Sequence, residues 1–235
     1  MNKLRDKIRQ ATDNRPAALG FAAAGRKKSP SLLLFVRGNK TGVASVSEVI
    51  DGYLVGSPND RPAEAAEVAR GLVVQDGKLP AEHEFDFVLV DEQAPAAALL
   101  TEELSYLMKA GVEMSDSLLR ALHALPLDGL WVESTGPLTV GSQVALMRLS
   151  GFAGKPLFVD VKEAPSSSDL EVLREAGAIG IVVSADLGSD RITELKKTIE
   201  NLPPRRKLRR DEREPAALIG QVPPSGDEDE DLHEG

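Results

Sequence analysis

Charged residues stand at the ends of several short apolar runs in this sequence, and they are the side chains that could do chemistry. In residues 127–134, LDGLWVES, an apolar run ends in Glu133. Asp91, Lys109, Asp160 and Lys162 stand in similar places on other apolar runs. A carboxylate can act as a general acid or base, and a lysine whose pKa is lowered by burial can act as a base or form a Schiff base. We expect these five residues to be catalytic, in proton-transfer or carbon–carbon bond chemistry.

Three of the five are carboxylates, which allows a metal site as an alternative. Mg²⁺ and Mn²⁺ prefer oxygen ligands, so Asp91, Glu133 and Asp160 could hold one of these ions as a cofactor. The chain has no cysteine, and its three histidines lie away from the ends of the apolar runs. We therefore expect neither a cysteine nucleophile nor a zinc site built from histidines.

The same charges also allow a purely structural interpretation. An isolated charge is costly to bury, and lysines and carboxylates at one end of a core can pair with one another. The charged residues could then form a salt-bridged plug over the core. A ligand site requires a cavity above these charges, whereas a plug requires them to be paired with no cavity.

The apolar runs themselves predict buried parallel strands, because they are nearly continuous and do not alternate with polar residues. Four of them align without gaps, at 50–57, 85–92, 127–134 and 178–185. Three others are expected at 17–24, 31–38 and 155–162. The interval between 85 and 128 is too long for one strand–helix unit, and we place a hidden strand at 104–111, although its leucine spacing also fits a helix face.

Helical spacing of apolar residues occupies the segments between these runs. It is found at 61–72, 115–125, 141–152, 168–177 and 189–202, with an N-terminal helix within 1–14. The helix at 168–177 is expected to begin with a capping box, Ser168 to Glu171, and to stop at Gly177. Alternating strands and helices predict an α/β fold with a parallel sheet. Eight strands predict a single (β/α)8 TIM barrel, and without the strand at 104–111 an open doubly wound sheet is the alternative.

The sequence also resembles known barrels. The stretch LEVLREAGAIGIVVSA is similar to the late strands of small TIM barrels of the phosphate-binding type, such as thiamine-phosphate synthase or indole-glycerol-phosphate synthase. The combination LPLDG…PLTV…GKPLFV…LREAGAIGIVV, within 125–183, resembles an uncharacterised bacterial barrel family over about the last half of the barrel. The resemblance implies a site at the carboxyl ends of the strands, where TIM barrels carry their active sites.

Residues near the strand ends are also expected to bind substrate. They are Arg37, Ser57, Ser184, Gly188 and Ser189. Phosphate sites use glycine-rich loops and helix N-termini, and the loop 184–191 offers Gly188 and Ser189 just before a helix. Asp186 and Asp190 in the same loop would repel a phosphate, and a serine at a helix start is commonly an ordinary cap.

Composition restricts the partners. The chain has 235 residues and a formal net charge of −9. Residues 203–235 hold 6 basic and 9 acidic residues, which leaves 22 and 28 for the rest, so the body is itself acidic and we expect it to bind no nucleic acid. With no apolar segment of membrane length and no signal sequence, we expect a cytoplasmic protein.

The C-terminal segment, 203–235, is expected to be a disordered charged tail after a barrel domain of residues 1–202. Its RRKLRR and PAALIG stretches could contact a protein partner. The sequence also leaves a homo-oligomer open. The function that it favours is a small-molecule lyase, aldolase or isomerase acting on a small anionic or carbonyl metabolite. The alternative is a non-catalytic barrel that serves as a ligand sensor or scaffold.

Overall fold

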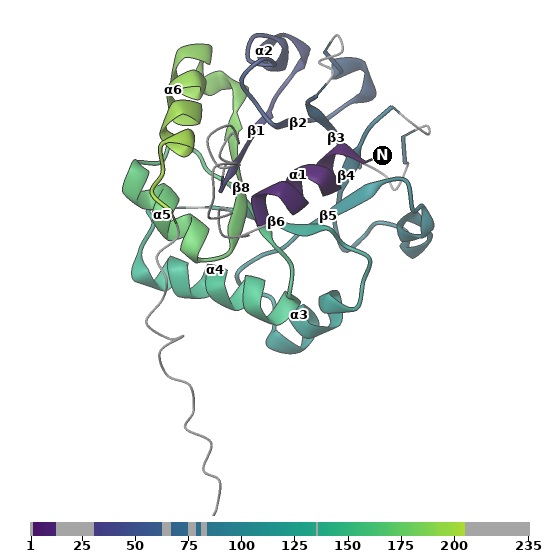
Figure 1. Cartoon of the computed structure of the whole chain (residues 1–235). Helices are drawn as coiled ribbons and strands as arrows, with labels where there is room; N and C mark the ends of the chain where they lie inside the picture. Colours follow the sequence, from purple (N-terminus) through teal and green to yellow (C-terminus); the bar gives the residue numbers. More distant parts are fainter. Residues whose placement is uncertain are drawn as a thin grey trace, which may run out of the picture. The chain divides into compact units, whose positions relative to one another are not determined.

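Eight parallel strands close into a barrel in the computed structural model of the chain (Figure 1). The structure describes residues 2–12, 31–62, 67–74, 79–80, 84–134 and 136–204. Each strand pairs with the next, and the first pairs with the last. The strands are β1 Leu33–Arg37, β2 Gly52–Val55, β3 Ala69–Val73, β4 Phe87–Val90, β5 Ser105–Lys109, β6 Gly129–Glu133, β7 Leu157–Asp160 and β8 Ala178–Ser184. The predicted TIM barrel is confirmed, and the open-sheet alternative is wrong.

Helices lie between most of these strands in the described part of the chain, and each of β5 to β8 is followed by an α-helix of at least 8 residues. The α-helices are α1 Lys3–Thr12, α2 Lys40–Ala44, α3 Asp116–His123, α4 Val140–Ala153, α5 Ser167–Glu175 and α6 Ser189–Glu200. The short 3₁₀ helices are η2 Pro58–Asp60, η3 Ala96–Leu100 and η4 Ala185–Leu187. No helix in the described part of the chain is long and apolar enough to cross a membrane. Contacts divide the chain into Met1–Pro204 and Arg205–Gly235, and the second unit lies outside the described residues.

One predicted element changes, and another lies outside the described residues. The hidden strand at 104–111 is confirmed as β5. The predicted helix at 61–72 is wrong over its second half, where β3 runs instead. Val68 and Leu72 lie four residues apart, which imitates a helix face, but Ala69 and Gly71 between them, and Val73 after them, lie on the inner side of the barrel. The segment 17–24 lies outside the described residues, and the ring closes without it because β1 pairs with β8.

The capping box of α5 begins two residues earlier than predicted. Ser166 accepts a hydrogen bond from the backbone N–H of Asp169, whose carboxylate accepts one from the N–H of Ser166. Ser168, the predicted cap, lies within the helix. The helix ends at Glu175, two residues before Gly177, whose φ of 100° lies in the region that favours glycine.

Three phenylalanine rings fill the middle of the barrel. Phe35 meets Phe87 and Phe158 edge to face, with ring centroids 5.9 and 5.2 Å apart. Glycines on the neighbouring strands make room for them, because a Cβ on Gly52 or on Gly71 would lie 2.1 Å from the nearest phenylalanine ring. The alternation of large and small residues closes the centre of the barrel as a packed core.

The four runs that align without gaps in the sequence are the even strands, β2, β4, β6 and β8. Three of them follow an aspartate whose carboxylate accepts a hydrogen bond from a backbone N–H of the preceding strand. Asp51 accepts from Leu34 at 2.8 Å, Asp86 from Arg70 at 2.9 Å, and Asp128 from Tyr106 at 3.0 Å. The acidic residue that opens these repeats therefore fixes strand pairing at the amino ends of the strands.

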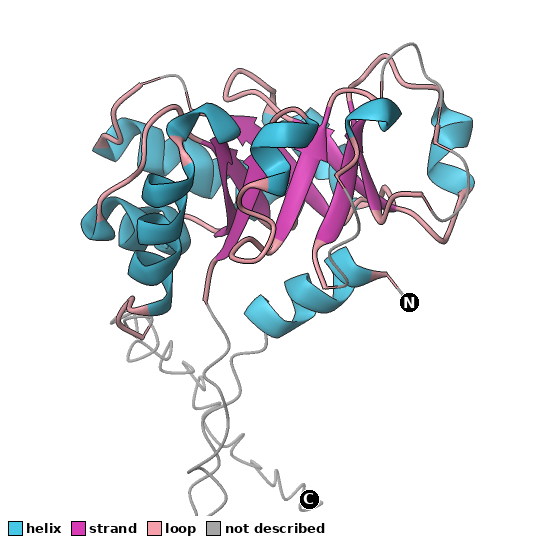
Figure 2. Cartoon of the chain, turned by 90° about the horizontal axis from the view of Figure 1, so that it is seen from above, coloured by secondary structure: helices cyan, strands magenta, loops and turns pink. Residues whose placement is uncertain are grey.

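Helix α1 covers this amino end of the barrel (Figures 1 and 2). Leu4 is fully buried in the same apolar cluster as Leu33 and Ile179. Asn2 donates to the carbonyl oxygen of Asp86 at 2.7 Å, and Arg5 donates to Asp128 at 3.0 Å. The carboxyl ends of the strands lie at the opposite end.

Candidate active site

The carboxyl ends of the strands surround a cavity of about 310 Å³, here called the mouth cavity. Five of the predicted site residues line it: Arg37, Lys109, Glu133, Asp160 and Lys162. The rest of the lining is mostly apolar and consists of Leu54, Val73, Leu89, Trp131 and Ser134. A volume near 300 Å³ is at the lower end of the range for small-molecule pockets.

Strand register brings the charged residues together. Glu133 on β6 is the register partner of Asp160 on β7, and Lys109 on β5 is the partner of Trp131 on β6. Residues paired in this way point to the same side of a sheet. Trp131 and Glu133 are two residues apart on β6, so their side chains point to the same, inner side of the barrel. The indole of Trp131 is 2% exposed and lies beneath the carboxylate of Glu133.

Asp160 is the most buried charge of the mouth cavity. Arg37 Nε donates a hydrogen bond of 2.7 Å to its Oδ2, and the two side chains are 44% and 9% exposed. Burial raises the pKa of Asp160 above its ordinary value; the hydrogen bond and charge of Arg37 oppose this, and the charge of Glu133 adds to it. A carboxyl whose pKa is raised in a cleft is suited to hold and release a proton.

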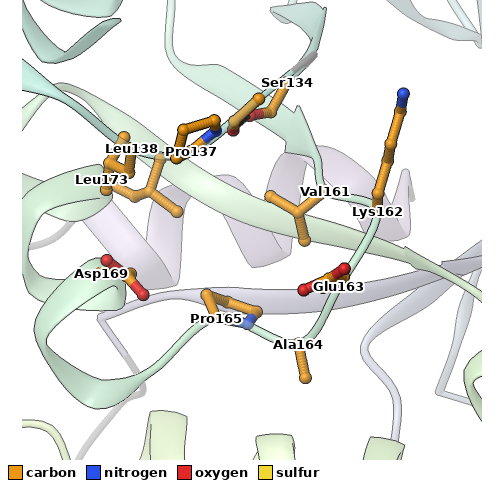
Figure 3. Close-up of a pocket in the computed structure, with 11 residues that line it drawn as sticks. Ser134, Pro137, Leu138, Val161, Lys162, Glu163, Ala164, Pro165, Asp169 and Leu173 are labelled. Carbon is orange, nitrogen blue, oxygen red and sulfur yellow. Dashed lines mark hydrogen bonds between the residues drawn. The ribbon is translucent and has the colours of Figure 1, made fainter.

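The other three charged residues of the mouth are exposed. Among the described residues, Lys109, Glu133 and Lys162 form no ion pair, and Arg37–Asp160 is the one pair in this lining. Figure 3 shows the amino group of Lys162 directed away from Glu163 and Asp169. The five charges thus line a cavity, and only Arg37 and Asp160 are paired with each other within the described residues. A plug over the core would require all of them to be paired with no cavity above.

A larger cavity of about 790 Å³ adjoins the mouth between the loops that follow β4, β5 and β6; we call it the β5–β6 cavity. Asp91, predicted to lie with the other four catalytic residues, lines this cavity and not the mouth. The side chain of Asp91 accepts a hydrogen bond of 3.0 Å from the backbone N–H of Gln93. The turn after β4 therefore carries Asp91 outward.

A third cavity, of about 400 Å³, lies between the loops after β6 and β7 and is called the β6–β7 cavity (Figure 3). Lys162 and Ser134 line both it and the mouth. Its carboxylates are Glu163 and Asp169, and the second of these is part of the cap of α5.

The other four predicted binding residues are absent from the lining of the mouth. Ser57 caps η2, and Ser184 caps η4 while its hydroxyl donates to the carboxylate of Asp186 at 2.9 Å. Gly188, with φ 91°, precedes α6, and Ser189 is the first residue of that helix. Ser57 and Ser184 therefore form local capping contacts.

The donor set for a metal does not come together. Over the described residues there is no group of three or more histidine, cysteine, aspartate or glutamate side chains that could hold a metal ion. Asp91 lines the β5–β6 cavity, whereas Asp160 lies in the mouth beside Arg37. Asp91, Glu133 and Asp160 therefore do not fit the Mg²⁺ or Mn²⁺ site that their residue types suggested.

Several lining residues were missed from the sequence. Val73 lies on β3, which was predicted as helix, so its inward position could not be assigned. Ser134 directly follows Glu133 and borders all three cavities. Its position one residue beyond the end of β6 could have predicted that Ser134 lies at the site.

No protein-family model matches the sequence, and no curated protein matches it. Solved structures do match in fold. One is 3-keto-L-gulonate-6-phosphate decarboxylase from Vibrio cholerae O1, with a TM-score of 0.58 at 12% identity over 74% of this chain and 99% of that one. The chain is a TIM barrel.

Two further structures place it beside similar barrels. Thiamine phosphate pyrophosphorylase from Pyrococcus furiosus matches with a TM-score of 0.52 at 12% identity, over 74% of this chain and 98% of its own. The tryptophan synthase complex from the same organism matches with a TM-score of 0.52 at 14% identity, over 73% and 96%. The resemblance of this TIM barrel to barrels of the phosphate-binding type is confirmed at the level of the fold.

Proposed function

We propose that this TIM barrel is an enzyme, a lyase, aldolase or isomerase that acts on a small anionic or carbonyl metabolite in the mouth cavity. The observation that carries the proposal is the cavity itself, with a half-buried cation, a buried carboxyl and three exposed charges around it. Active sites of TIM barrels lie at this end of the strands. Two of the similar structures are named for phosphorylated compounds, which supports an anionic substrate.

Asp160 is the proposed general acid or base. Its raised pKa lets it take a proton from a carbon next to a carbonyl group and return it to the product. Arg37 holds its carboxylate in place and, being 44% exposed, can also face a substrate anion. Glu133, the register partner of Asp160, disfavours a second negative charge there.

Lys109 and Lys162 are the proposed partners of the substrate's carbonyl or anionic group. Either amine, once neutral, could attack the carbonyl carbon to form a carbon–nitrogen bond with loss of water, giving a Schiff base. If it stays protonated, the same amine would stabilise the negative charge that develops on the carbonyl oxygen when a proton leaves.

Proton exchange in D₂O tests the proposal before the reaction is known. Small 2-oxo acids and sugar phosphates are incubated with the protein, and proton NMR follows deuterium entry next to the carbonyl. We expect exchange with the parent and a loss of about 10²–10⁴-fold in Asp160→Asn. Glu163→Gln, which removes one charge outside the mouth, is the control and should exchange like the parent.

Borohydride trapping separates the two roles of the lysines. Reduction of a Schiff base would add the substrate's mass to Lys109 or Lys162, located by peptide mass spectrometry. Saturable binding of a compound with neither exchange nor trapping for any of those tested would favour the non-catalytic ligand sensor instead.

A further inference from the structure

The mouth cavity and the β5–β6 cavity lie side by side. They share Lys109, Trp131, Glu133 and Ser134 as lining residues. The β5–β6 cavity is the larger, at about 790 Å³ against about 310 Å³. More of the space open to a ligand therefore lies beside the mouth than within it.

The outer wall of the β5–β6 cavity is fixed by Arg148 of α4. Its guanidinium donates to the carbonyl oxygens of Val112, at 3.1 Å, and of Met114, and to the carboxylate of Asp116 at 2.6 Å. These bonds tie the loop after β5 to α4 across the cavity wall. The cavity is thus formed before any ligand enters, which lowers the cost of binding.

The two cavities differ in charge. The mouth is lined by three cations and two carboxylates. The β5–β6 cavity has one cation, Lys109, and four carboxylates: Asp91, Glu92, Glu113 and Glu133. Apart from the turn made by Asp91, no hydrogen bond or ion pair occupies these carboxylates within the described residues. Met114, Leu138 and Leu146 add apolar surface to the same lining.

We propose that the two cavities form one site for a bifunctional metabolite, with an anionic or carbonyl group in the mouth and a primary amine at the end of a short hydrocarbon chain in the β5–β6 cavity. The inference rests on the proposed function of the mouth and assigns the substrate class. The hydrocarbon would cover the apolar surface, and the ammonium group would meet the carboxylates. A second anion would be repelled there, and a plain hydrocarbon end would gain no attraction from these exposed carboxylates.

Fluorescence of Trp131 can report binding directly, because it is the one tryptophan in the sequence and lines both cavities. The probes are ω-amino carboxylates of several chain lengths, with the unsubstituted carboxylates and the dicarboxylates of the same lengths. At the best length we expect the amine to bind about tenfold more tightly than the unsubstituted carboxylate, as a charged hydrogen bond allows. The dicarboxylate should bind more weakly than either.

Three variants distinguish the failure of this inference from the failure of the mouth site. The double substitution Glu92→Gln with Glu113→Gln removes two of the four carboxylates and should reduce the tenfold preference, with a much smaller effect on the affinity for the unsubstituted carboxylate. Glu163→Gln, a charge removal in the β6–β7 cavity, should leave the preference intact. Lys162→Gln should weaken all carboxylates together.

Equal affinities for amine and unsubstituted carboxylate in the parent would overturn the two-part site while leaving the mouth proposal standing. A loss of preference in Glu163→Gln equal to that of the double variant would overturn it too, since net charge alone would then explain the selectivity. No response of Trp131 to any of the three classes, up to their solubility limits, would count against the mouth and the two-part site together.

Discussion

The two ends of the barrel use carboxylates in opposite ways. At the amino end, each of the aspartates before β2, β4 and β6 accepts a backbone hydrogen bond, and a cation lies beside it: Lys196 at 2.7 Å from Asp51, and Arg70 and Arg5 at 3.0 Å from Asp86 and Asp128. At the carboxyl end, Glu133 has no such partner among the described residues, and Asp160 has only Arg37. The comparison teaches that residue type alone does not separate a structural carboxylate from one free to meet a ligand. What separates them is a hydrogen bond from the backbone of the neighbouring strand together with a paired cation.

Strand β4 gives the sharpest contrast, because an aspartate stands at each of its ends. Asp86→Ala removes the acceptor for both the backbone N–H and the side chain of Arg70. With side chains 16% and 8% exposed, breaking this pair should cost about 3–5 kcal/mol in the free energy of unfolding, measured by urea denaturation. Asp91→Ala is the control and should cost less than about 1 kcal/mol, since Asp91 is exposed and fixes only a turn. Equal losses would remove the contrast between the ends.

Strand β2 extends the contrast to packing. A Cβ at Gly52, at the start of the strand, would meet the ring of Phe35, whereas a Cβ at Gly56, just past its end, would meet nothing within 4 Å. Gly52→Ala should therefore destabilise the fold by about 1–3 kcal/mol, as overpacked cores do. Gly56→Ala should change the free energy of unfolding by less than about 0.5 kcal/mol. Thermal denaturation of both variants checks the pair, and a stable Gly52→Ala would show that the packed centre yields more readily than the contacts suggest.

Asp160 should make the fold less stable as pH rises. Burial raises its pKa above the ordinary 3.8, so the folded protein holds the proton more tightly than the unfolded chain. The resulting stabilisation is complete below 3.8 and is lost as pH rises through the raised value. Asp160→Asn lacks this loss, and Arg37 remains exposed enough to stay hydrated. The melting temperature of the variant minus that of the parent should therefore increase from acid to neutral pH. A difference that decreases with pH would contradict the burial argument.

The sequence was sufficient for the fold where its periodicity was unambiguous. Continuous apolar runs identified six of the eight strands, and the long interval between 85 and 128 located a seventh, β5, whose leucines also fit a helix. It failed at β3, where Val68 and Leu72 imitate a helix face and Gly71 lacks a side chain that could mark the inner face. That glycine is needed only because Phe87 from the next strand occupies its space, which is a tertiary contact.

The candidate site could be predicted in part, because its charged residues stand at the ends of the predicted strands. Lys109, Glu133 and Asp160 stand at the ends of apolar runs, which predicted that they lie together, and all three line the mouth cavity. The same reasoning misplaced Asp91, because the residue after a strand follows the turn and not the pleat. Nor could it foresee that Ser57 and Ser184 cap short helices, since a serine near a helix start serves a cap or a ligand with the same side chain.

The melting temperature of Glu133→Gln, measured beside that of the parent, tests the central claim that the carboxyl-end charges form a site. Glu133 is exposed and unpaired within the described residues, so Gln should leave the melting temperature unchanged or slightly higher. Asp128→Asn, at the other end of β6, calibrates the measurement, because it turns an amide toward the N–H of Tyr106 or toward Arg5 and should cost about 1–3 kcal/mol. A destabilisation by Glu133→Gln as large as that of Asp128→Asn would contradict the account, because Glu133 would then hold the fold together as the structural carboxylates do.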